Sequence, residues 1–339
     1  MAGQPINIDP AQIPELVKML TQREHPHNWQ LIEEIFTVSR RYLRDNSADR
    51  WRHGPDRVVT VAKQAFDEIS KHTSVAGKTY LDLGCGRFNP FGTLTYFYLN
   101  GINSGYAIDT QAADAQRSAE AIYDLLCDAL ARPEHWKRDE TQYEDYFRRI
   151  RSFNLAALRR GDLAGGLNEI SLVHKVGDAG GPGMLPSGEI DLISSRAVLE
   201  HCLDFSGVMK MLFDAMAPGA IAYHAIDLVD HRVYDSPQSY NYWSFLCEGQ
   251  LGGQNSICNL LRSNQITEMV KDVGFTIIQF ERTTHEPPAG LRSQLRDEYK
   301  TLSDEDLATI GVEVVIQKPL TQNQHRSADI AAIEARSIS

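Results

Sequence analysis

The chain has 339 residues, of which 42% are hydrophobic and 23% are charged. This is a globular composition, and it argues against collagen-like, coiled-coil and disordered classes. The 34 basic and 45 acidic residues give a formal net charge of -11. Such a charge argues against a nucleic-acid binder, because that class needs a surface that neutralises phosphates.

The five cysteines are scattered, and no two stand at a CxxC spacing. We therefore expect neither a thiolate-based zinc site nor a disulfide framework. The first residues show no basic stretch followed by an apolar one, and no window approaches ~18 uninterrupted apolar residues. These features predict a cytoplasmic protein with no secretory signal and no membrane span.

Residues 1–75 are predicted to form a helical extension that serves as a lid. One helix is expected to follow Asn28, which is a plausible N-cap. A second is expected over residues 55–70, where apolar side chains recur at helical spacing. Its predicted buried residues are Val58, Val59, Ala62, Ala65, Phe66 and Ile69.

Seven short apolar runs then follow, mostly separated by helical patterns. They cover residues 78–86, 104–110, 171–179, 189–195, 219–228, 274–282 and 312–318. Strands that alternate with helices predict an α/β fold, with a mostly parallel sheet and helices on both faces. We assign this domain to residues 76–318.

One connection in this domain is unusually long. Roughly 60 residues separate the second run from the third, far more than a simple crossover needs. Residues 113–168 are therefore predicted to be an insertion that folds as a helical pair. Residues 228–262 are predicted to be rich in loops, Ser263 to cap a helix over 264–272, and residues 319–339 to form a polar tail.

The first apolar run ends in the turn Gly84-Cys85-Gly86. Glycines let the backbone bend tightly and let a ligand approach closely. Asn89-Pro90 is a suitable cap and first position for the following helix. Asp109, at the end of the second run, is placed to accept hydrogen bonds from the ribose hydroxyls of an adenosine cofactor. The alternative is a tight turn with an ordinary capping acid.

The type of cofactor follows from what the turn lacks. Nicotinamide sites usually show G-x-G-x-x-G/A, whereas this chain reads GCGRFN over residues 84–89. The next helix also begins with Asn-Pro instead of the open amides that bind a pyrophosphate. The pattern therefore points away from a dinucleotide.

The run LDLGCG over residues 81–86 resembles the cofactor loop of class I S-adenosylmethionine-dependent methyltransferases. Residues 194–220 resemble the fourth strand of that family, the turn after it and the Pro-Gly before the fifth strand. The resemblance implies a seven-stranded Rossmann-like sheet, with the last strand antiparallel between the fifth and sixth. Many members carry a third glycine where this chain has Phe88.

The resemblance also implies S-adenosylmethionine as the cofactor. It places Gly84 and Gly86 beside the methionine part, Asp109 on the ribose, and the pair Asp178-Ala179 beside the adenine. The predicted cofactor-binding residues are Asp82, Gly84, Cys85, Gly86, Asp109, Asp178, Ala179 and Arg196.

Methyl transfer requires an acceptor held in line and shielded from water. A base is required only when the acceptor must lose a proton. The densest ionisable cluster follows the fifth run, and His201 follows the fourth, at the sheet edge where α/β folds bind ligands. The predicted catalytic residues are Asp227, Asp230, His231 and His201.

Two alternatives remain for this cluster. It is either an acceptor site or a solvated turn with a local ion pair. A divalent-metal site is a third interpretation, but the spacing fits no metal template, so no metal is predicted.

Aromatic side chains in the loop after the fifth run are candidates for a wall around the acceptor. The alternative is a small satellite core beneath a long loop. The predicted substrate-binding residues are His224, Arg232, Tyr240, Tyr242 and Trp243.

Residues 224–275 also resemble methyltransferases from bacterial surface-polysaccharide and small-metabolite gene clusters. This resemblance implies a small-molecule acceptor and, first of all, O-methylation of a sugar or metabolite. S-methylation of a thioether to a sulfonium, and a non-catalytic protein that binds the cofactor, are the alternatives. Neither a nucleic acid nor a membrane is expected as a partner, and formation of a homo-oligomer stays open.

Overall fold

The computed structural model describes residues 54–178, 181, 183–249 and 258–320. The chain divides into two compact units, Met1–Arg57 and Val58–Ser339. The predicted helix after Asn28, Ala179 and nearly all of the polar tail lie outside the described residues. The lid role of residues 1–75 therefore stays a prediction, while helix α4 (Pro55–Ser70) forms at the predicted position.

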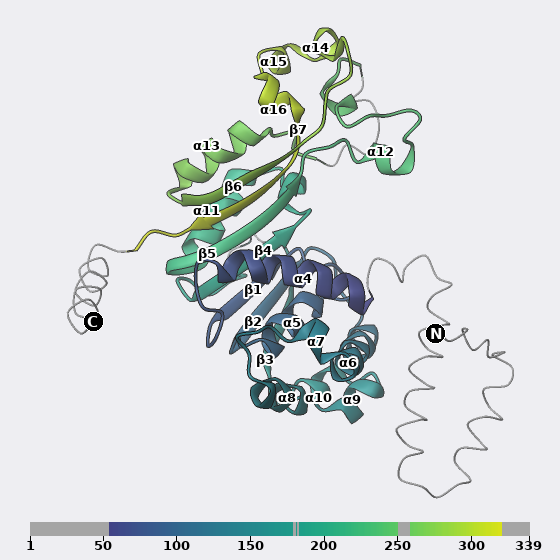
Figure 1. Ribbon diagram of the computed structural model, residues 1–339, viewed down its shortest axis with the longest axis vertical. Helices are drawn as coiled ribbons and strands as arrows, with labels where there is room; N and C mark the ends of the chain where they lie inside the picture. Colours follow the sequence, from purple (N-terminus) through teal and green to yellow (C-terminus); the bar gives the residue numbers. More distant parts are fainter. Residues whose placement is uncertain (1–53, 179–180, 182, 250–257, 321–339) are drawn as a thin grey trace, which may run out of the picture. The chain divides into compact units, whose positions relative to one another are not determined.

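A seven-stranded sheet forms the centre of the second unit, in the order β3-β2-β1-β4-β5-β7-β6 (Figure 1). Its first five strands are parallel, and β7 runs antiparallel between β5 and β6. All seven predicted strands and the antiparallel position of the last one are confirmed. The strands are β1 (Thr79–Leu83), β2 (Ser104–Asp109), β3 (Ser171–Val176), β4 (Ile190–Arg196), β5 (Met216–Asp227), β6 (Thr276–Thr284) and β7 (Thr309–Gln317).

Helices cover both faces of the sheet, because successive strand residues point to opposite faces. Tyr80 and Tyr223 pack against α4, α5 (Gly92–Leu99), α6 (Ala115–Ala131) and α8 (Tyr143–Arg151). Leu81 and Ala222 pack against α11 (Phe205–Ala215) and α13 (Ser263–Val273). The α/β layer architecture predicted from the sequence is therefore confirmed.

The predicted helical pair in residues 113–168 is wrong. The structure forms five helices there: α6, α7 (Pro133–Trp136), α8, α9 (Leu155–Arg159) and α10 (Leu163–Gly166). Pro133 ends α6, because the residue before a proline is disfavoured in helical conformation. Asn154 accepts a hydrogen bond from Ala157 N at 3.1 Å, and Asp162 accepts one from Gly165 N at 2.9 Å, so two short helices begin at their own caps.

Two helix starts also differ from the prediction. α5 begins at Gly92 after Phe91, so the expected cap and first position at Asn89-Pro90 are wrong. Ser263 is the first residue of α13, and Arg262 is its N-cap. In α13 the Gln265 side chain accepts from the Arg262 backbone at 2.9 Å, which replaces a serine cap.

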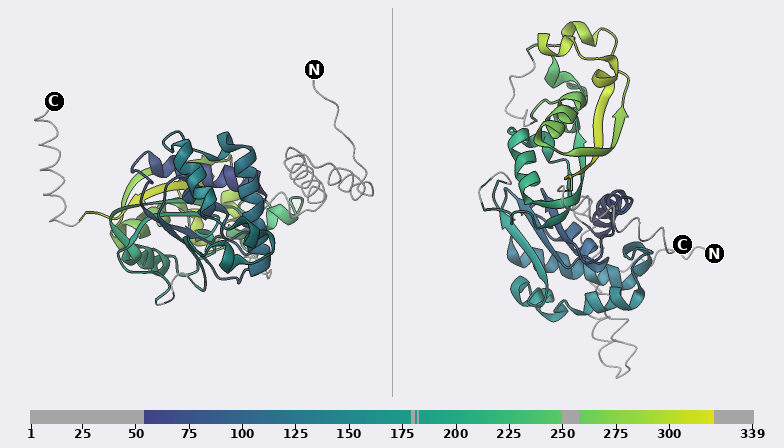
Figure 2. Two further views of the ribbon diagram at one scale, coloured as in Figure 1. Left: turned by 90° about the horizontal axis from the view of Figure 1, so that it is seen from below. Right: turned by 90° about the vertical axis from the view of Figure 1, so that its left-hand side faces the viewer.

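A third hydrophobic core, smaller than the two on the faces of the sheet, lies where β5 ends. Residues 285–308, between β6 and β7, form α14 (Leu291–Gln294), α15 (Asp297–Lys300) and α16 (Asp304–Ala308) (Figure 2). They pack against the loop that holds α12 (Arg232–Asp235) and η3 (Ser244–Leu246). We call this cluster the edge core. Its buried residues are Trp243, Phe245, Leu246, Cys247, Cys258, Leu291, Leu295, Tyr299 and Leu307.

The longest described helix, α6, has 17 residues. Within the ranges that the structure describes, no helix has the length and apolarity that a membrane span requires.

Candidate functional site

The glycine turn after β1 is shaped by two residues with positive φ. Gly84 has a φ of +73°, and a Cβ there would lie 2.1 Å from Val198 Cγ2. Gly86 has a φ of +76°, and a Cβ there would meet nothing within 4 Å. Gly84 therefore permits close packing against the segment after β4, whereas Gly86 faces open space. This is the shape that a cofactor cradle requires.

Asp109 holds this turn from the end of β2. Its carboxylate accepts from Gly86 N and from Gln111 N, both at 2.9 Å. Gly177 N donates to the Asp109 carbonyl at 2.9 Å, which brings the start of the loop that contains Asp178 to the same sheet edge. Gly86, Asp109 and Asp178 thus lie at the carboxyl ends of β1, β2 and β3, which are adjacent in the sheet.

Asp82 lies beneath the turn and is 8% exposed. Burial raises the pKa of its carboxyl to about 7, against a hydrogen bond from Thr93 that lowers it. The nearby charge of Asp109 raises the pKa further.

Arg196 ends β4 and lies in a different network. Its guanidinium donates to Gln64 on α4, and Gln64 Nε2 donates to Glu313 at 2.7 Å. Tyr223 also donates to Glu313, at 2.8 Å. The structure thus links Arg196 to α4 through Gln64, which in turn reaches Glu313 on β7, and the contact of Arg196 with the cofactor stays a prediction.

Five polar side chains gather where β4 and β5 end. We call them the strand-end cluster: Glu200, His201, Asp227, His231 and Cys258. Glu200 and His201 lie on η2 (Leu199–His201), Asp227 ends β5, and His231 and Cys258 come from the loop that follows. Ala197, between β4 and η2, has a φ of +52°, and such strain in a non-glycine residue is typical of functional sites.

The geometry within the cluster is close. His231 Nε2 lies 3.4 Å from Asp227 Oδ2, and Tyr234 donates to the same carboxylate at 2.6 Å. The rings of His201 and His231 meet edge to face, with centroids 4.9 Å apart.

Burial and neighbouring groups shift the acids and bases of this cluster. Glu200 is 2% exposed, neither of its oxygens has a hydrogen-bond partner, and burial raises its pKa to about 7. Asp227 and then Cys258 raise the pKa of His231 to about 10. Burial would raise the pKa of Cys258, but His201 and His231 outweigh it and lower that pKa.

Asn259 fixes the turn that carries Glu200 and His201. Its backbone N donates to the Glu200 carbonyl at 2.6 Å. Its side chain donates to the Leu199 carbonyl at 2.7 Å and to the Cys202 carbonyl at 3.0 Å. These bonds bring the adjacent Cys258 beside the two histidines.

Two predicted residues form an ion pair of their own. Arg232 donates to both oxygens of Asp230, with the shortest distance at 2.6 Å, and both side chains are buried. The Arg232 guanidinium also lies over the Tyr240 ring, 4.3 Å from its centroid. The structure therefore joins Asp230 and Arg232 in a local ion pair beside Tyr240, as the alternative interpretation expected, but this pair is buried and not solvated.

His224 and Trp243 are buried inside packed regions. His224 is fully buried in the sheet, its Nδ1 lies 2.7 Å from Ser195 Oγ, and burial lowers its pKa to about 4. Trp243 belongs to the edge core and donates to the Leu307 carbonyl at 2.7 Å. Tyr242 packs against that core. The satellite-core alternative thus describes Trp243.

Sequence reasoning missed two members of the cluster. Neither Glu200 nor Cys258 was among the predicted site residues. A buried acid in a short turn carries no sequence signal, and Cys258 lies far along the chain from His201.

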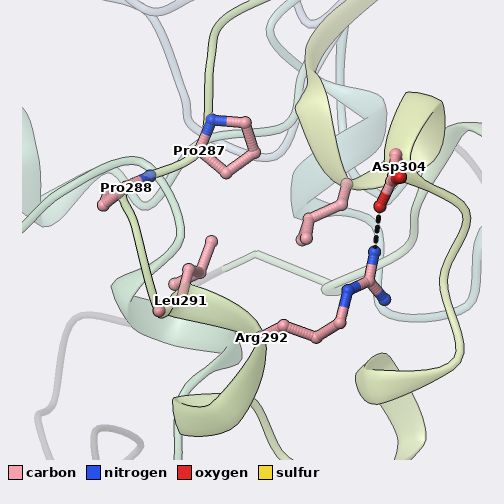
Figure 3. A pocket seen from close by; sticks show the side chains of 7 residues that line it. Pro287, Pro288, Leu291, Arg292 and Asp304 are labelled. Carbon is pink, nitrogen blue, oxygen red and sulfur yellow. Dashed lines mark hydrogen bonds and ion pairs between the residues drawn. The ribbon is translucent and has the colours of Figure 1, made fainter.

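A separate pocket of about 230 Å³ lies among α14, α16 and the prolines before them (Figure 3). Arg292 spans it to Asp304, with an ion-pair distance of 2.6 Å. Its lining includes Pro287, Pro288 and Leu291, and none of its lining residues belongs to the glycine turn or the strand-end cluster.

Comparison with known proteins identifies the family to which this fold belongs. Residues 48–280, more than half of the chain, match the model of a family described as a methyltransferase domain. A comparison with curated proteins finds no match.

Solved structures with similar folds include methyltransferases. One is an S-adenosylmethionine-dependent methyltransferase from Methanosarcina mazei, 18% identical, covering 75% of this chain and 98% of that one, with a TM-score of 0.41. Another, from Mesorhizobium loti, is 15% identical and covers 77% and 99%, with a TM-score of 0.41. A geranyl diphosphate methyltransferase in complex with S-adenosylmethionine is 12% identical and covers 80% and 92%, with a TM-score of 0.44. From the family match and the sheet and glycine turn described above, the chain belongs to the methyltransferase-domain family and is a class I, S-adenosylmethionine-dependent methyltransferase.

Proposed function

We propose that this enzyme methylates a hydroxyl oxygen of a small polar molecule, a sugar or a related metabolite, at the strand-end cluster. The observation that carries the proposal is the position of that cluster. Val198, which packs on Gly84, directly precedes η2 with Glu200 and His201. The cofactor turn and the cluster thus occupy neighbouring strand ends of one sheet edge, where α/β sheets bind ligands.

The residues around the turn fit S-adenosylmethionine. Gly86 leaves open space at the turn, and Asp109 offers a carboxylate that hydrogen-bonds hydroxyl groups. Asp82 and Asp178 add acidic groups at the same edge, which suits a cationic ligand. The cofactor supplies a methyl group that its sulfonium already makes electrophilic. The protein must therefore hold the acceptor in line and exclude water.

Burial of the cluster favours a small acceptor. Glu200 is 2% exposed, and the side chains of His231 and Asp227 are 20% and 26% exposed. Cys258 belongs to both the strand-end cluster and the edge core, so the two adjoin. A polymer surface reaches such groups poorly, and the net charge of -11 disfavours nucleic acid.

The chemistry of the cluster favours an oxygen acceptor. A hydroxyl must lose a proton during methylation, whereas a thioether has none to lose. Glu200 and Asp227 place two carboxylates at the cluster that are able to receive that proton. Both Glu200 oxygens are buried without a hydrogen-bond partner, so this carboxyl is free to bind an acceptor hydroxyl.

The proposal is tested with methyl-labelled S-adenosylmethionine and a panel of small hydroxyl and thioether compounds. We expect label in a small-molecule product, and mass spectrometry should show an O-methyl ether. A sulfonium product would overturn the oxygen assignment. Label retained on polymer would overturn the small-molecule assignment, and tight cofactor binding without turnover on either the panel or a cell extract would favour a non-catalytic protein.

The Glu200→Gln variant tests the proposed role of that carboxyl. We expect kcat to fall by about 10²-fold or more, because the proton acceptor is lost, while cofactor affinity is retained. Glu189→Gln, which changes an exposed glutamate just before β4, is the matched control and should keep full activity. Unchanged kcat in Glu200→Gln would contradict the assignment.

A further inference from the structure

Three metal-ligating side chains converge in the strand-end cluster. His201, His231 and Cys258 each offer one ligand atom, and these atoms all lie within 4.8 Å of one another. The three residues come from different segments, and each is partly or fully buried. Side chains brought together at this distance from distant parts of a chain form a preorganised ligand set.

Glu200 supplies a second and independent observation. Its carboxyl is 2% exposed, and neither oxygen has a hydrogen-bond partner among the residues that the structure describes. Burying a carboxylate without a partner is costly, and a bound cation removes that cost. Glu200 directly precedes His201 on η2, so the carboxyl belongs to the same short turn as one of the ligands.

Asp227 completes an arrangement that is common around bound metals. It lies 3.4 Å from His231 Nε2, so its carboxylate stands directly beside one of the proposed ligands. A carboxylate behind a metal-binding histidine fixes the orientation of the ring and strengthens the metal bond. Asn259 fixes the backbone from Leu199 to Cys202, and so holds the turn that carries His201.

We propose that His201, His231 and Cys258 bind a Zn²⁺ ion, with Glu200 balancing its charge. Two imidazoles and one thiolate are ligands that zinc prefers, and three protein ligands leave a fourth tetrahedral position for water or a ligand oxygen. The Cys258 thiol loses its proton to solvent when the ion binds. Thiolate, Glu200 and Asp227 then offset the double positive charge.

From the sequence, a divalent-metal site at this cluster was only a third interpretation and a thiolate-based zinc site was not expected, because the spacing of the three residues matches no zinc motif. The proposal is independent of the acceptor's identity. Zinc content and methyl transfer are measured separately, so a failure of one proposal leaves the other standing.

The test starts from the full-length protein, stripped with a chelator and dialysed against Zn²⁺ or Co²⁺. We expect elemental analysis to find one tightly held zinc per chain. The Co²⁺ form should show the intense visible bands of a tetrahedral site together with a thiolate-to-cobalt charge-transfer band. These readouts do not depend on enzymatic activity.

Variants decide which residues hold the ion. Cys258→Ser should abolish the charge-transfer band and weaken zinc binding by about 10²-fold or more, and His201→Asn should weaken zinc binding to a similar degree. Cys247→Ser changes another buried cysteine of the edge core that lies outside the ligand set, and it should bind the ion as the parent does. Cofactor binding and thermal unfolding show whether each variant is folded.

Three results would overturn the proposal. The parent protein binds no zinc after reconstitution, cobalt gives an octahedral spectrum without a thiolate band, or folded Cys258→Ser binds zinc as tightly as Cys247→Ser. If either cysteine variant does not fold, the zinc affinities of His201→Asn and His285→Asn are compared instead. His285 lies outside the ligand set, so it serves as the control.

Discussion

At the scale of single residues, the two glycines of the cofactor turn have different tasks. Both have positive φ, a conformation that costs an L-residue roughly 1–2 kcal/mol. Only Gly84 also packs against a side chain, Val198, that leaves no room for a Cβ. Gly84 is therefore required by the fold, and we propose that Gly86 is required by the ligand.

Substitution should separate these tasks. Gly86→Ala should lower the free energy of unfolding by about 1–2 kcal/mol, while the Kd for S-adenosylmethionine rises by about tenfold or more because a methyl group enters the cradle. Gly84→Ala should lose about 1–3 kcal/mol more in stability from overpacking. Chemical denaturation and calorimetric titration measure both quantities.

A double variant provides the control. Val198→Ala should restore part of the stability that Gly84→Ala loses, because it removes the clashing methyl groups. If the double variant is less stable than Gly84→Ala alone, the steric explanation is wrong.

Asp82 gives the fold a pH dependence. Burial raises the pKa of its carboxyl to about 7 in the folded state, above its ordinary value of 3.8. The folded state therefore binds more protons than the unfolded state between these values, so stability falls as the pH rises through 7. Asp82→Asn keeps a neutral side chain at every pH. The Tm of this variant minus that of the parent should therefore increase as the pH rises from about 5 to 8.

Melting curves at both ends of that range make the comparison. Asp139→Asn, at an exposed carboxylate, controls for the general loss of one negative charge. A constant difference in Tm between Asp82→Asn and the parent across the range would contradict the assignment.

At the scale of elements, Arg262 connects three segments around the strand-end cluster. It is fully buried at the start of α13, and burial lowers its pKa to about 10. Its guanidinium donates to the Leu228 carbonyl at 2.8 Å, to the Asp306 carbonyl at 3.2 Å, and to the Thr309 carbonyl. The ends of β5 and α16 and the start of β7 are thereby tied to α13.

Removing this guanidinium should destabilise the protein strongly. Arg262→Met leaves three buried carbonyls unpaired, so we expect the free energy of unfolding to fall by about 3 kcal/mol or more. Arg148→Met removes a surface ion pair with Asp145 and should cost at most about 1 kcal/mol. Equal midpoints of urea unfolding for the two variants would show that Arg262 does not tie these segments together.

At the scale of the whole molecule, the sequence predicted the sheet and its cofactor edge. Buried strands form continuous apolar runs, and helices between them leave few options except a mostly parallel sheet. The glycine turn directly follows β1, and Asp109 is the last residue of β2, which pairs with β1. Both were predictable because they stand at the ends of readable strands. The helices α14, α15 and α16 were not, because elements of four or five residues have no readable period.

The sequence by itself thus determined the α/β sheet, the positions of its strands and the residues of the glycine turn, because local patterns of apolar residues and glycines specify them. Only the tertiary structure decided which polar groups act together. It paired Asp230 with Arg232, buried His224 in the sheet, and joined Cys258 and Glu200 to His201 and His231. In the strand-end cluster, Glu200 and His201 meet His231 and Cys258, which lie far along the chain, and such contacts form only when the strand ends and the edge core pack together.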